Sequence, residues 1–355
     1  MNIGIDLGTS SVIVYVDGKG IVLSEASVTA SESNSGKVIS IGSKAYKMIG
    51  RNPSSISVTR PLKNGVISDF TATQCILRYY LQKVCGNRIF KPNIVICMPS
   101  SITGLEKRTL LDLATSSGAG RACLIEEPLA AAFGAGVEYN NHKGIMVVDI
   151  GGGTTDIAVI TMGSISVSKS IYVAGNAFDD AIMRYVKRER DMIIGEITAE
   201  EIKKKIGCAY MRDAEIAIQV KGKNYISGMP EYFEITTTEV FLALREQLEK
   251  IAEGIRSVLE ITPPELSSDI AESGIILTGG GSLLRGLDGF IFKKTGIKTV
   301  TAHDPVNCVA RGIGTALGHI DILAENGYLF KTREDITGRN EDVTSELESF
   351  IISDT

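Results

Sequence analysis

The sequence has few of the residues on which most metal centres and disulfide frameworks depend. Only three of its 355 residues are histidine, tryptophan is absent, and no two of the six cysteines are spaced as CxxC. A structural zinc site is therefore not expected, and the cysteines are expected to be buried small hydrophobes in a reducing cytoplasm. They are Cys75, Cys85, Cys97, Cys123, Cys208 and Cys308.

Long apolar runs and strong net charge are also missing. No run of eighteen apolar residues occurs, so no helix is expected to span a membrane. Met1 and Asn2 lead straight into an apolar segment, which we expect to leave no room for a signal peptide. The net charge of −5 gives no general footprint for nucleic acid, which is not an expected partner. A length of 355 residues suggests two or more domains.

Two common nucleotide-binding motifs are absent as well. The Gly-Lys pairs that begin at 18, 36 and 222 are followed by Gly, Val and Asn, so none completes a GxxxxGK[ST] phosphate loop. No GxGxxG follows an apolar strand either. The P-loop and Rossmann interpretations therefore fail.

A different glycine pattern occurs twice. The segment IGIDLGTSSVIVYV runs from Ile3 to Val16, and MVVDIGGGTTDIAVI runs from Met146 to Ile160. Each reads as a strand, an aspartate, a glycine turn with hydroxyl groups, and a second strand. Turn amides can point at phosphate oxygens, glycine permits close approach, and two aspartates can hold Mg²⁺ through its waters. The pair predicts a nucleotide phosphate tail held between two related halves, although a tight hairpin and a β-bulge are the simpler alternatives.

Strands alternate with helices along the chain, which predicts an α/β fold. Thr236 and Glu239 are spaced as a capping box before a long apolar stripe, which we expect Pro263-Pro264 to end. A helix over 104–117 is expected to use Leu105 with Leu110, Leu111 and Leu113.

The predicted division is 1–30 with 71–140 and 318–335 as one core, 31–70 as its insertion, 141–178 with 236–317 as a second core, 179–235 as its insertion, and 336–355 as a tail.

The motifs resemble a known superfamily. DLGTSS at 6–11, DIGGGTTD at 149–156 and LTGGGSLL at 277–284 resemble the nucleotide-contacting motifs of actin, sugar kinases and DnaK-type chaperones. LIEEPLAAAFGAG at 124–136, RPLKNGVISDF at 60–70 and DPVNCVARGIGTAL at 304–317 are similar to the bacterial actin family MreB. The resemblance extends from Ile3 to about Lys331. It implies an actin-like ATPase fold with ATP and Mg²⁺ in a central cleft between the two halves.

The resemblance also implies a role for each motif. Asp6 and Asp149 would orient the metal, and Glu127 would hold the water that attacks the phosphate. The remaining residues would contact the nucleotide: Gly8, Thr9, Ser10, Gly151, Gly152, Gly153, Thr154 and Thr155 its phosphates, Glu200 and Lys203 its adenosine, and Gly279, Gly280 and Gly281 its adenine and sugar. Glu127 could instead be a helix-start acid that needs no chemistry, an interpretation that fits Glu126 better, although the two are hard to separate from sequence. Glu200 and Lys203 could equally be a solvated ion pair, and the third glycine turn could be a helix end.

The function implied is a cytoskeletal ATPase with slow hydrolysis. It would assemble head to tail into filaments at the inner face of the cytoplasmic membrane and direct cell shape with the cell-wall elongation machinery. A small-molecule, sugar-type kinase of the same fold is the alternative. Family members often begin with a basic amphipathic helix, and this chain is not expected to have that anchor. The loop VCGNRIFKPN could contact lipid through Ile89 and Phe90, or these side chains could cap the local core.

Overall fold

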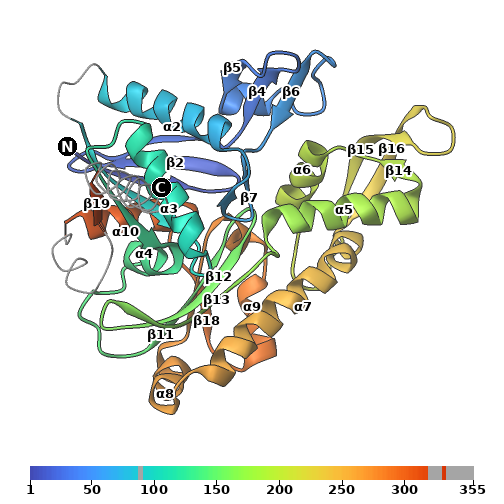
Figure 1. The fold of residues 1–355 in the computed structure, drawn as a ribbon. Helices are drawn as coiled ribbons and strands as arrows, with labels where there is room; N and C mark the ends of the chain where they lie inside the picture. The colour runs from blue at the N-terminus through green and yellow to red at the C-terminus, as the bar shows by residue number, and fades with distance from the viewer. Residues whose placement is uncertain (87–90, 319–329, 333–355) are drawn as a thin grey trace, which may run out of the picture.

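The computed structural model describes residues 1–86, 91–318 and 330–332, the last three by their backbone alone. The described chain forms two halves, each built around a large sheet and each carrying a smaller inserted sheet (Figure 1). The predicted α/β fold with two related halves is therefore confirmed.

The two large sheets have matching topology. The first has the order β19-β10-β9-β1-β2-β3 and the second β13-β12-β11-β17-β18. In each, the strand that carries the aspartate, β1 or β11, pairs antiparallel with the strand after the turn and parallel with a later strand. The strands of the first sheet are β1 (Asn2–Leu7), β2 (Ser11–Val16), β3 (Gly20–Ala26), β9 (Asn93–Met98), β10 (Arg121–Glu126) and β19 (Phe330–Thr332); those of the second are β11 (Ile145–Ile150), β12 (Thr155–Thr161), β13 (Ser164–Ile171), β17 (Ile275–Thr278) and β18 (Thr299–Thr301).

The central strands are apolar throughout because both of their faces are buried. Side chains of a strand alternate between faces. In β9, Ile94 and Ile96 enter the outer core of the first half, whereas Val95 and Cys97 enter a core between the two sheets. β11 and β12 divide in the same way, with Val147, Ala158 and Ile160 on the inner side. Such strands show continuous apolar runs rather than alternation.

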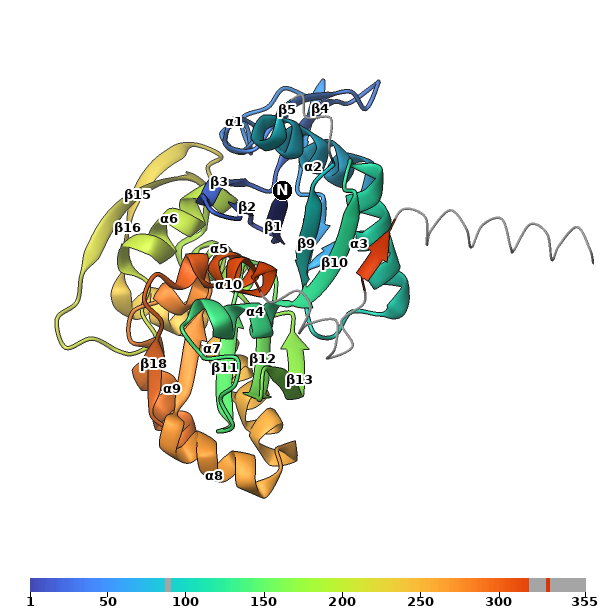
Figure 2. The ribbon, with the colours of Figure 1, turned by 90° about the vertical axis from the view of Figure 1, so that its left-hand side faces the viewer.

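Two helices fill the space between the sheets. α4 (Glu127–Gly134) and α10 (Cys308–Leu317) contribute most of the core there, and Figure 2 shows them lying between the two sheets. Their backbones touch: a Cβ on Gly134 would lie 1.8 Å from the Cys308 oxygen, and one on Gly312 would lie 1.7 Å from the Ala130 oxygen. Glycine is required at both positions by this close approach, so the two halves meet through direct backbone contact between α4 and α10.

Helices α2 (Phe70–Cys85) and α3 (Gly104–Ser116) cover the outer face of the first sheet. Asp69 caps α2 by accepting a hydrogen bond from the Ala72 amide at 2.9 Å. The prediction for Leu105 is wrong, since it is 73% exposed. At 3.6 residues per turn, Leu105 lies about 140° around α3 from Leu110, in the first turn of the helix and outside its buried stripe.

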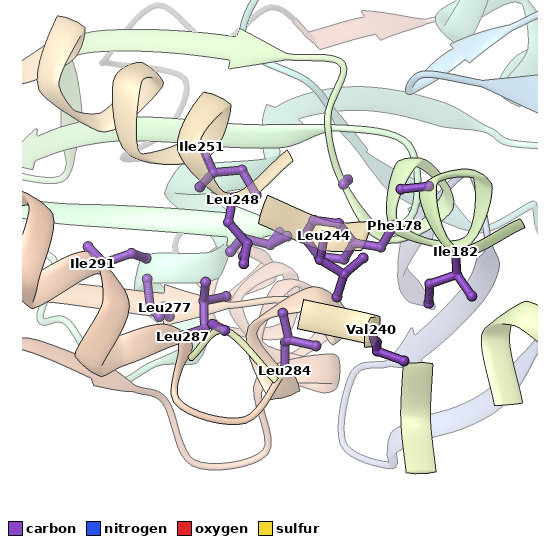
Figure 3. Close-up of a cluster of buried hydrophobic side chains, with 14 of the residues drawn as sticks. Phe178, Ile182, Val240, Leu244, Leu248, Ile251, Leu277, Leu284, Leu287 and Ile291 are labelled. Carbon is purple, nitrogen blue, oxygen red and sulfur yellow. The ribbon is translucent and has the colours of Figure 1, made fainter. Parts of the chain in front are cut away.

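The second half has its core under one long helix. α7 (Thr237–Ile261) begins with the predicted capping box of Thr236 and Glu239, which the structure confirms. Its stripe of Val240, Leu244, Leu248 and Ile251 packs with α5 (Gly175–Arg190) and α9 (Leu287–Thr295), as Figure 3 shows. The helix ends before Pro263-Pro264 as predicted. A further helix that was not predicted follows directly, α8 (Pro264–Ser273), in which Pro264 is a first-turn residue.

Each half carries a smaller unit with its own short strands. The first contains β4 (Thr29–Glu32), β5 (Val38–Ile41), α1 (Ser43–Tyr46) and β6 (Ile56–Thr59), followed by a hairpin of β7 (Leu62–Lys63) and β8 (Val66–Ile67). The second contains β14 (Met192–Ile193), α6 (Glu196–Ile206), β15 (Ala217–Asn224) and β16 (Pro230–Thr236). Two 3₁₀ turns, η1 (Gly280–Leu283) and η2 (Pro305–Asn307), complete the second half. Among the described helices, none is both long enough and apolar enough to cross a membrane.

Candidate functional site

A cavity of about 680 Å³ lies between the two halves. It opens at the ends of β1, β11 and β17, where each strand runs into a glycine turn. All of the sequence-predicted site residues line it except Thr155. The Thr155 side chain is buried, and its hydroxyl donates to the Val173 oxygen at 2.7 Å.

The turn after β1 is built with hydroxyl side chains. The Gly8 amide donates to the Ser11 oxygen at 3.0 Å, which closes the turn. Thr9 is buried and accepts a hydrogen bond from the Gly65 amide at 3.0 Å, which ties the β7–β8 hairpin to the turn. Ser10 is 3.5 Å from the side-chain oxygen of Asn176, at the start of α5. This first turn therefore contacts both the first insertion and the second half.

The turn after β11 begins with three glycines, and the first turn explains why two of them carry no side chain. A Cβ on Gly152 would lie 1.9 Å from the Ser10 hydroxyl, and one on Gly153 would lie 2.7 Å from the Thr9 hydroxyl. Neither glycine has a positive φ, so space and not backbone conformation requires them. The two turns are nested, with the hydroxyls of the first occupying the space that side chains of the second would need.

The third glycine turn packs beneath the second. Gly279 has a φ of 77°, and a Cβ there would lie 2.4 Å from the Ile150 oxygen. A Cβ on Gly281 would lie 2.3 Å from the Ile150 side chain. The start of α5 closes the other side, since the amide of Asn176 donates to the Gly152 oxygen at 2.8 Å. Three backbone segments thus converge on one cavity with little side-chain bulk between them.

Three carboxyl groups, Asp6, Glu127 and Asp149, line the base of the cavity, and a fourth, Asp156, is buried beside them. Burial raises the pKa of Asp6 to about 7, and the charge of Asp149 adds to the effect, although part of Asp6 faces the open cavity. Burial likewise raises the pKa of Asp149 to about 7, against a hydrogen bond of 2.7 Å from the Thr278 hydroxyl. Burial and then Asp156 raise the pKa of Glu127 well above its usual range. Like charges this close are unfavourable unless a cation offsets them.

Glu127 lines the cavity and Glu126 does not. Glu127 is the first residue of α4 and is only 8% exposed, whereas Glu126 is the last residue of β10. One oxygen of Glu126 is buried and has no hydrogen-bond partner among the described residues. Side chains of successive residues point in different directions at the end of a strand. Here the side chain of Glu127, and not that of Glu126, points into the cavity.

Asp156 is a further buried carboxyl, and it is not among the predicted site residues. It faces Asp149 across the β11–β12 pair and accepts hydrogen bonds from the Ser100 amide at 3.2 Å and the Ser170 hydroxyl at 2.5 Å. Burial raises its pKa against these hydrogen bonds. The sequence contains a signal for it, because an aspartate within the apolar strand segment TDIAVI is costly to bury unless it has a partner or a function.

Glu200 and Lys203 both line the cavity, but each has a different partner. The Lys203 ammonium donates to the Gly175 oxygen at 2.9 Å and to Asp179 at 2.8 Å. Glu200 accepts from the Tyr46 hydroxyl and pairs with Lys204 at 2.7 Å. Tyr46, Asn176 and Asp179 also line the cavity without a local motif, and Arg60 lines it from the start of the 60–70 motif. Among the described residues, no group of three or more His, Cys, Asp or Glu is arranged to hold a metal ion.

Comparison with known proteins gives a consistent result. The MreB/Mbl protein family matches residues 1–325. The chain is 46% identical to the cell shape-determining protein Mbl of Bacillus subtilis (strain 168), covering 91% of this chain and 97% of that protein. It is 44% identical to the cell shape-determining protein MreB of Escherichia coli (strain K12), covering 93% and 96%. The crystal structure of MreB5 of Spiroplasma citri bound to AMPPNP superimposes with a TM-score of 0.87 at 38% identity, covering 92% and 98%.

Proposed function

This chain belongs to the MreB/Mbl family of actin-like cytoskeletal proteins, and from that premise we propose that its cavity binds ATP with Mg²⁺ and hydrolyses it slowly. The observation that carries the proposal is the nesting of the two aspartate turns around one cavity. Each turn contains glycine, so the backbone amides of both turns can approach phosphate oxygens closely. The family relative from S. citri, crystallised with an adenine nucleotide, supports the choice of ATP over GTP.

The carboxyl groups at the base fit a divalent cation. Asp6 and Asp149 have raised pKa values because they are buried close together, and a bound cation would favour their charged forms. Two carboxylates suffice for Mg²⁺, which keeps several of its waters and needs few protein ligands. When bound, Mg²⁺ would supply positive charge against the phosphate oxygens.

Glu127 is the proposed positioning residue for the attacking water. Its carboxylate lies in the same cavity as the two turns and can accept a hydrogen bond from water. A raised pKa makes a carboxylate a stronger base, which suits proton transfer near neutral pH. Phosphoryl transfer depends mainly on positioning and charge stabilisation, which agrees with a site that has few other reactive groups. Gly8, Thr9, Ser10, Gly151 to Thr154 and Gly279 to Gly281 would contact the nucleotide, with Glu200 and Lys203 beside the adenosine.

The proposed role of hydrolysis is to control self-assembly. A contact between two different surfaces that does not close into a ring gives a filament, and family membership supports such head-to-tail assembly of this chain. The comparisons do not favour the kinase alternative, since the matched relatives are named for cell shape. We also propose the division into two cores with insertions at 31–70 and 179–235.

Association with the inner face of the cytoplasmic membrane and with the cell-wall elongation machinery is proposed on the same family premise. The predicted lipid contacts, Ile89 and Phe90, lie outside the described residues, as does the tail at 336–355, so both stay predictions from the sequence. Burying two such side chains contributes about 3–6 kcal/mol, which binds a filament of many copies far better than one monomer. Liposome co-sedimentation of Ile89→Ser/Phe90→Ser tests this. Equal binding by a polymerising double variant would exclude this loop as the anchor.

Sedimentation tests the proposed function directly. Purified protein is centrifuged with Mg·ATP, with Mg·ADP and without nucleotide over a range of concentrations, and phosphate release is followed in parallel. We expect polymer to pellet above a critical concentration with Mg·ATP, with phosphate release that accompanies assembly. Protein that stays monomeric with Mg·ATP across salt conditions and with anionic lipid present would contradict the proposal.

A further inference from the structure

Two polar contacts join the insertions across the mouth of the cavity. The hydroxyl of Tyr46, at the end of α1, donates to Glu200 on α6, 154 residues away in the chain. The Arg60 guanidinium donates to Glu196, also on α6, through Nε at 3.0 Å and through a second nitrogen. Figure 1 shows the small sheet of β4–β6 and helix α6 on the same side of the molecule. We call these four residues the clasp.

The clasp is built as one unit. Glu196 and Glu200 lie one turn apart on α6, so both carboxylates point from the same face. Opposite them, the Arg60 guanidinium carbon lies 5.8 Å from the centre of the Tyr46 ring, within cation–π range. All four residues line the cavity. The first half therefore supplies two donors and the second half two acceptors, at the edge of the space that holds the candidate site.

The charges favour the closed arrangement. Burial, and then the hydrogen bond to Glu200, raise the pKa of Tyr46, so its hydroxyl keeps the proton that it donates. Burial acts to raise the pKa of Glu200, but hydrogen bonds from Lys204 and Tyr46 outweigh it and lower the pKa. Glu200 thus stays an acceptor near neutral pH.

The ion pair of the clasp is partly exposed to water, so its contribution to holding the cavity closed is moderate. The Arg60 side chain is 18% exposed and that of Glu196 is 40% exposed, so water partly screens the pair. The base of the cavity differs, since α4 and α10 meet there through backbone contact at Gly134 and Gly312. Because backbone contact joins the two halves at the base and only polar side-chain contacts join them at the mouth, we expect the cavity to open at the mouth.

We propose that the clasp closes the cavity over a bound nucleotide and sets the rate at which the nucleotide leaves. Tyr46 and Arg60 are positioning residues in this arrangement: they hold α6, and with it Glu200, against the first half. The inference rests on the proposed function, because it takes the cavity to be the nucleotide site.

Release kinetics test the clasp. A fluorescent ADP analogue is bound with Mg²⁺ and chased with excess ADP in a stopped-flow instrument, and association is measured separately. Tyr46→Phe removes the donor but keeps the ring, and Arg60→Glu reverses one charge. Hydrogen bonds to charged groups that are partly screened correspond to about three- to tenfold changes in rate. We expect release to accelerate by about this factor in each variant, with thermal melting checked to confirm that each variant folds.

Two further variants make the result specific. Glu201→Gln is the matched control, since Glu201 pairs with Lys205 on the same helix, 3.6 Å away and exposed, and does not line the cavity. The double variant Arg60→Glu/Glu196→Arg restores opposite charges, and we expect it to recover slow release. Release in Tyr46→Phe and Arg60→Glu no faster than in Glu201→Gln would overturn the clasp while leaving the nucleotide site intact. A wild-type protein that does not bind the analogue would instead overturn the proposed function, and the clasp with it.

Discussion

The two aspartate turns have the same place in their sheets but are built by opposite means. The turn after Asp6 carries hydroxyl side chains, and Thr9 and Ser10 use them to reach the first insertion and α5. The turn after Asp149 carries three glycines, and at Gly152 and Gly153 those hydroxyls already occupy the space that a side chain would need. Asp149 accepts a hydrogen bond from Thr278, whereas no such bond to Asp6 is found among the described side chains.

This difference shows that the turns form one site and not two copies of a site. Each turn alone would be an ordinary strand connection. Nested, they bring two carboxylates and two glycine-containing backbone turns to a single cavity. The two halves therefore place their turns at matching positions in the two sheets. The difference between the turns, hydroxyl side chains in one and glycines in the other, lets them contact each other.

The largest expected effect comes from Glu127, which lines the same cavity as the two turns. Glu127→Ala should lower the rate of ATP hydrolysis by about 10²- to 10⁴-fold, the usual range for loss of a group that positions or deprotonates water. Nucleotide binding should be nearly unchanged, because the turns are intact. Phosphate release and equilibrium binding of ATP are the two measurements.

Glu126→Ala is the control for this effect, since its side chain does not line the cavity. It should keep most of the hydrolysis rate. An unchanged rate in Glu127→Ala, or an equal loss in both variants, would remove Glu127 from the mechanism.

The nesting itself is tested by adding one methyl group. Gly152→Ala places a Cβ 1.9 Å from the Ser10 hydroxyl, so the turns must separate. Overpacking of this kind costs about 1–3 kcal/mol in the free energy of unfolding. Ser10→Gly in the same chain should recover most of that loss, as chemical denaturation would show.

Gly289→Ala is the matched control for Gly152→Ala, because a Cβ at position 289, in α9, would meet no atom within 4 Å. It should leave stability unchanged or slightly raised. If Gly152→Ala is as stable as Gly289→Ala, the turns are not in contact.

A smaller effect is expected from the hydrogen bond that only Asp149 has. Thr278→Val removes the hydroxyl and keeps the shape, so Asp149 loses the partner that holds its carboxylate. A net loss of about 1 kcal/mol corresponds to roughly fivefold weaker binding of Mg·ADP, measured by titration calorimetry. Thr262→Val also removes a buried hydroxyl hydrogen bond, but at the end of α7. Equal affinities in the two variants would show that Thr278 has no role at the site.

Most of the fold could be predicted because its signals are local. The capping box at Thr236, the stripe along α7 and the two aspartate turns are each written in adjacent residues. The failures come from residues whose role depends on distant partners. Leu105 and Leu110 share a helix but not a face, and Tyr46 reaches the cavity from a segment without a motif. Arg60 and Asp156 lie within motifs, but adjacent residues do not show that Arg60 binds Glu196 or that Asp156 faces Asp149.

The most direct test of a single shared site is the binding of Mg·ADP to wild type, Asp6→Asn and Asp149→Asn by thermal shift. A ligand that binds only the folded state stabilises it by about 2.7 kcal/mol at one hundred times its Kd. The nested turns predict that either substitution alone abolishes the gain that Mg²⁺ adds to ADP, because both aspartates serve one ion. If either variant keeps the full Mg²⁺-dependent shift, the two turns do not share a site.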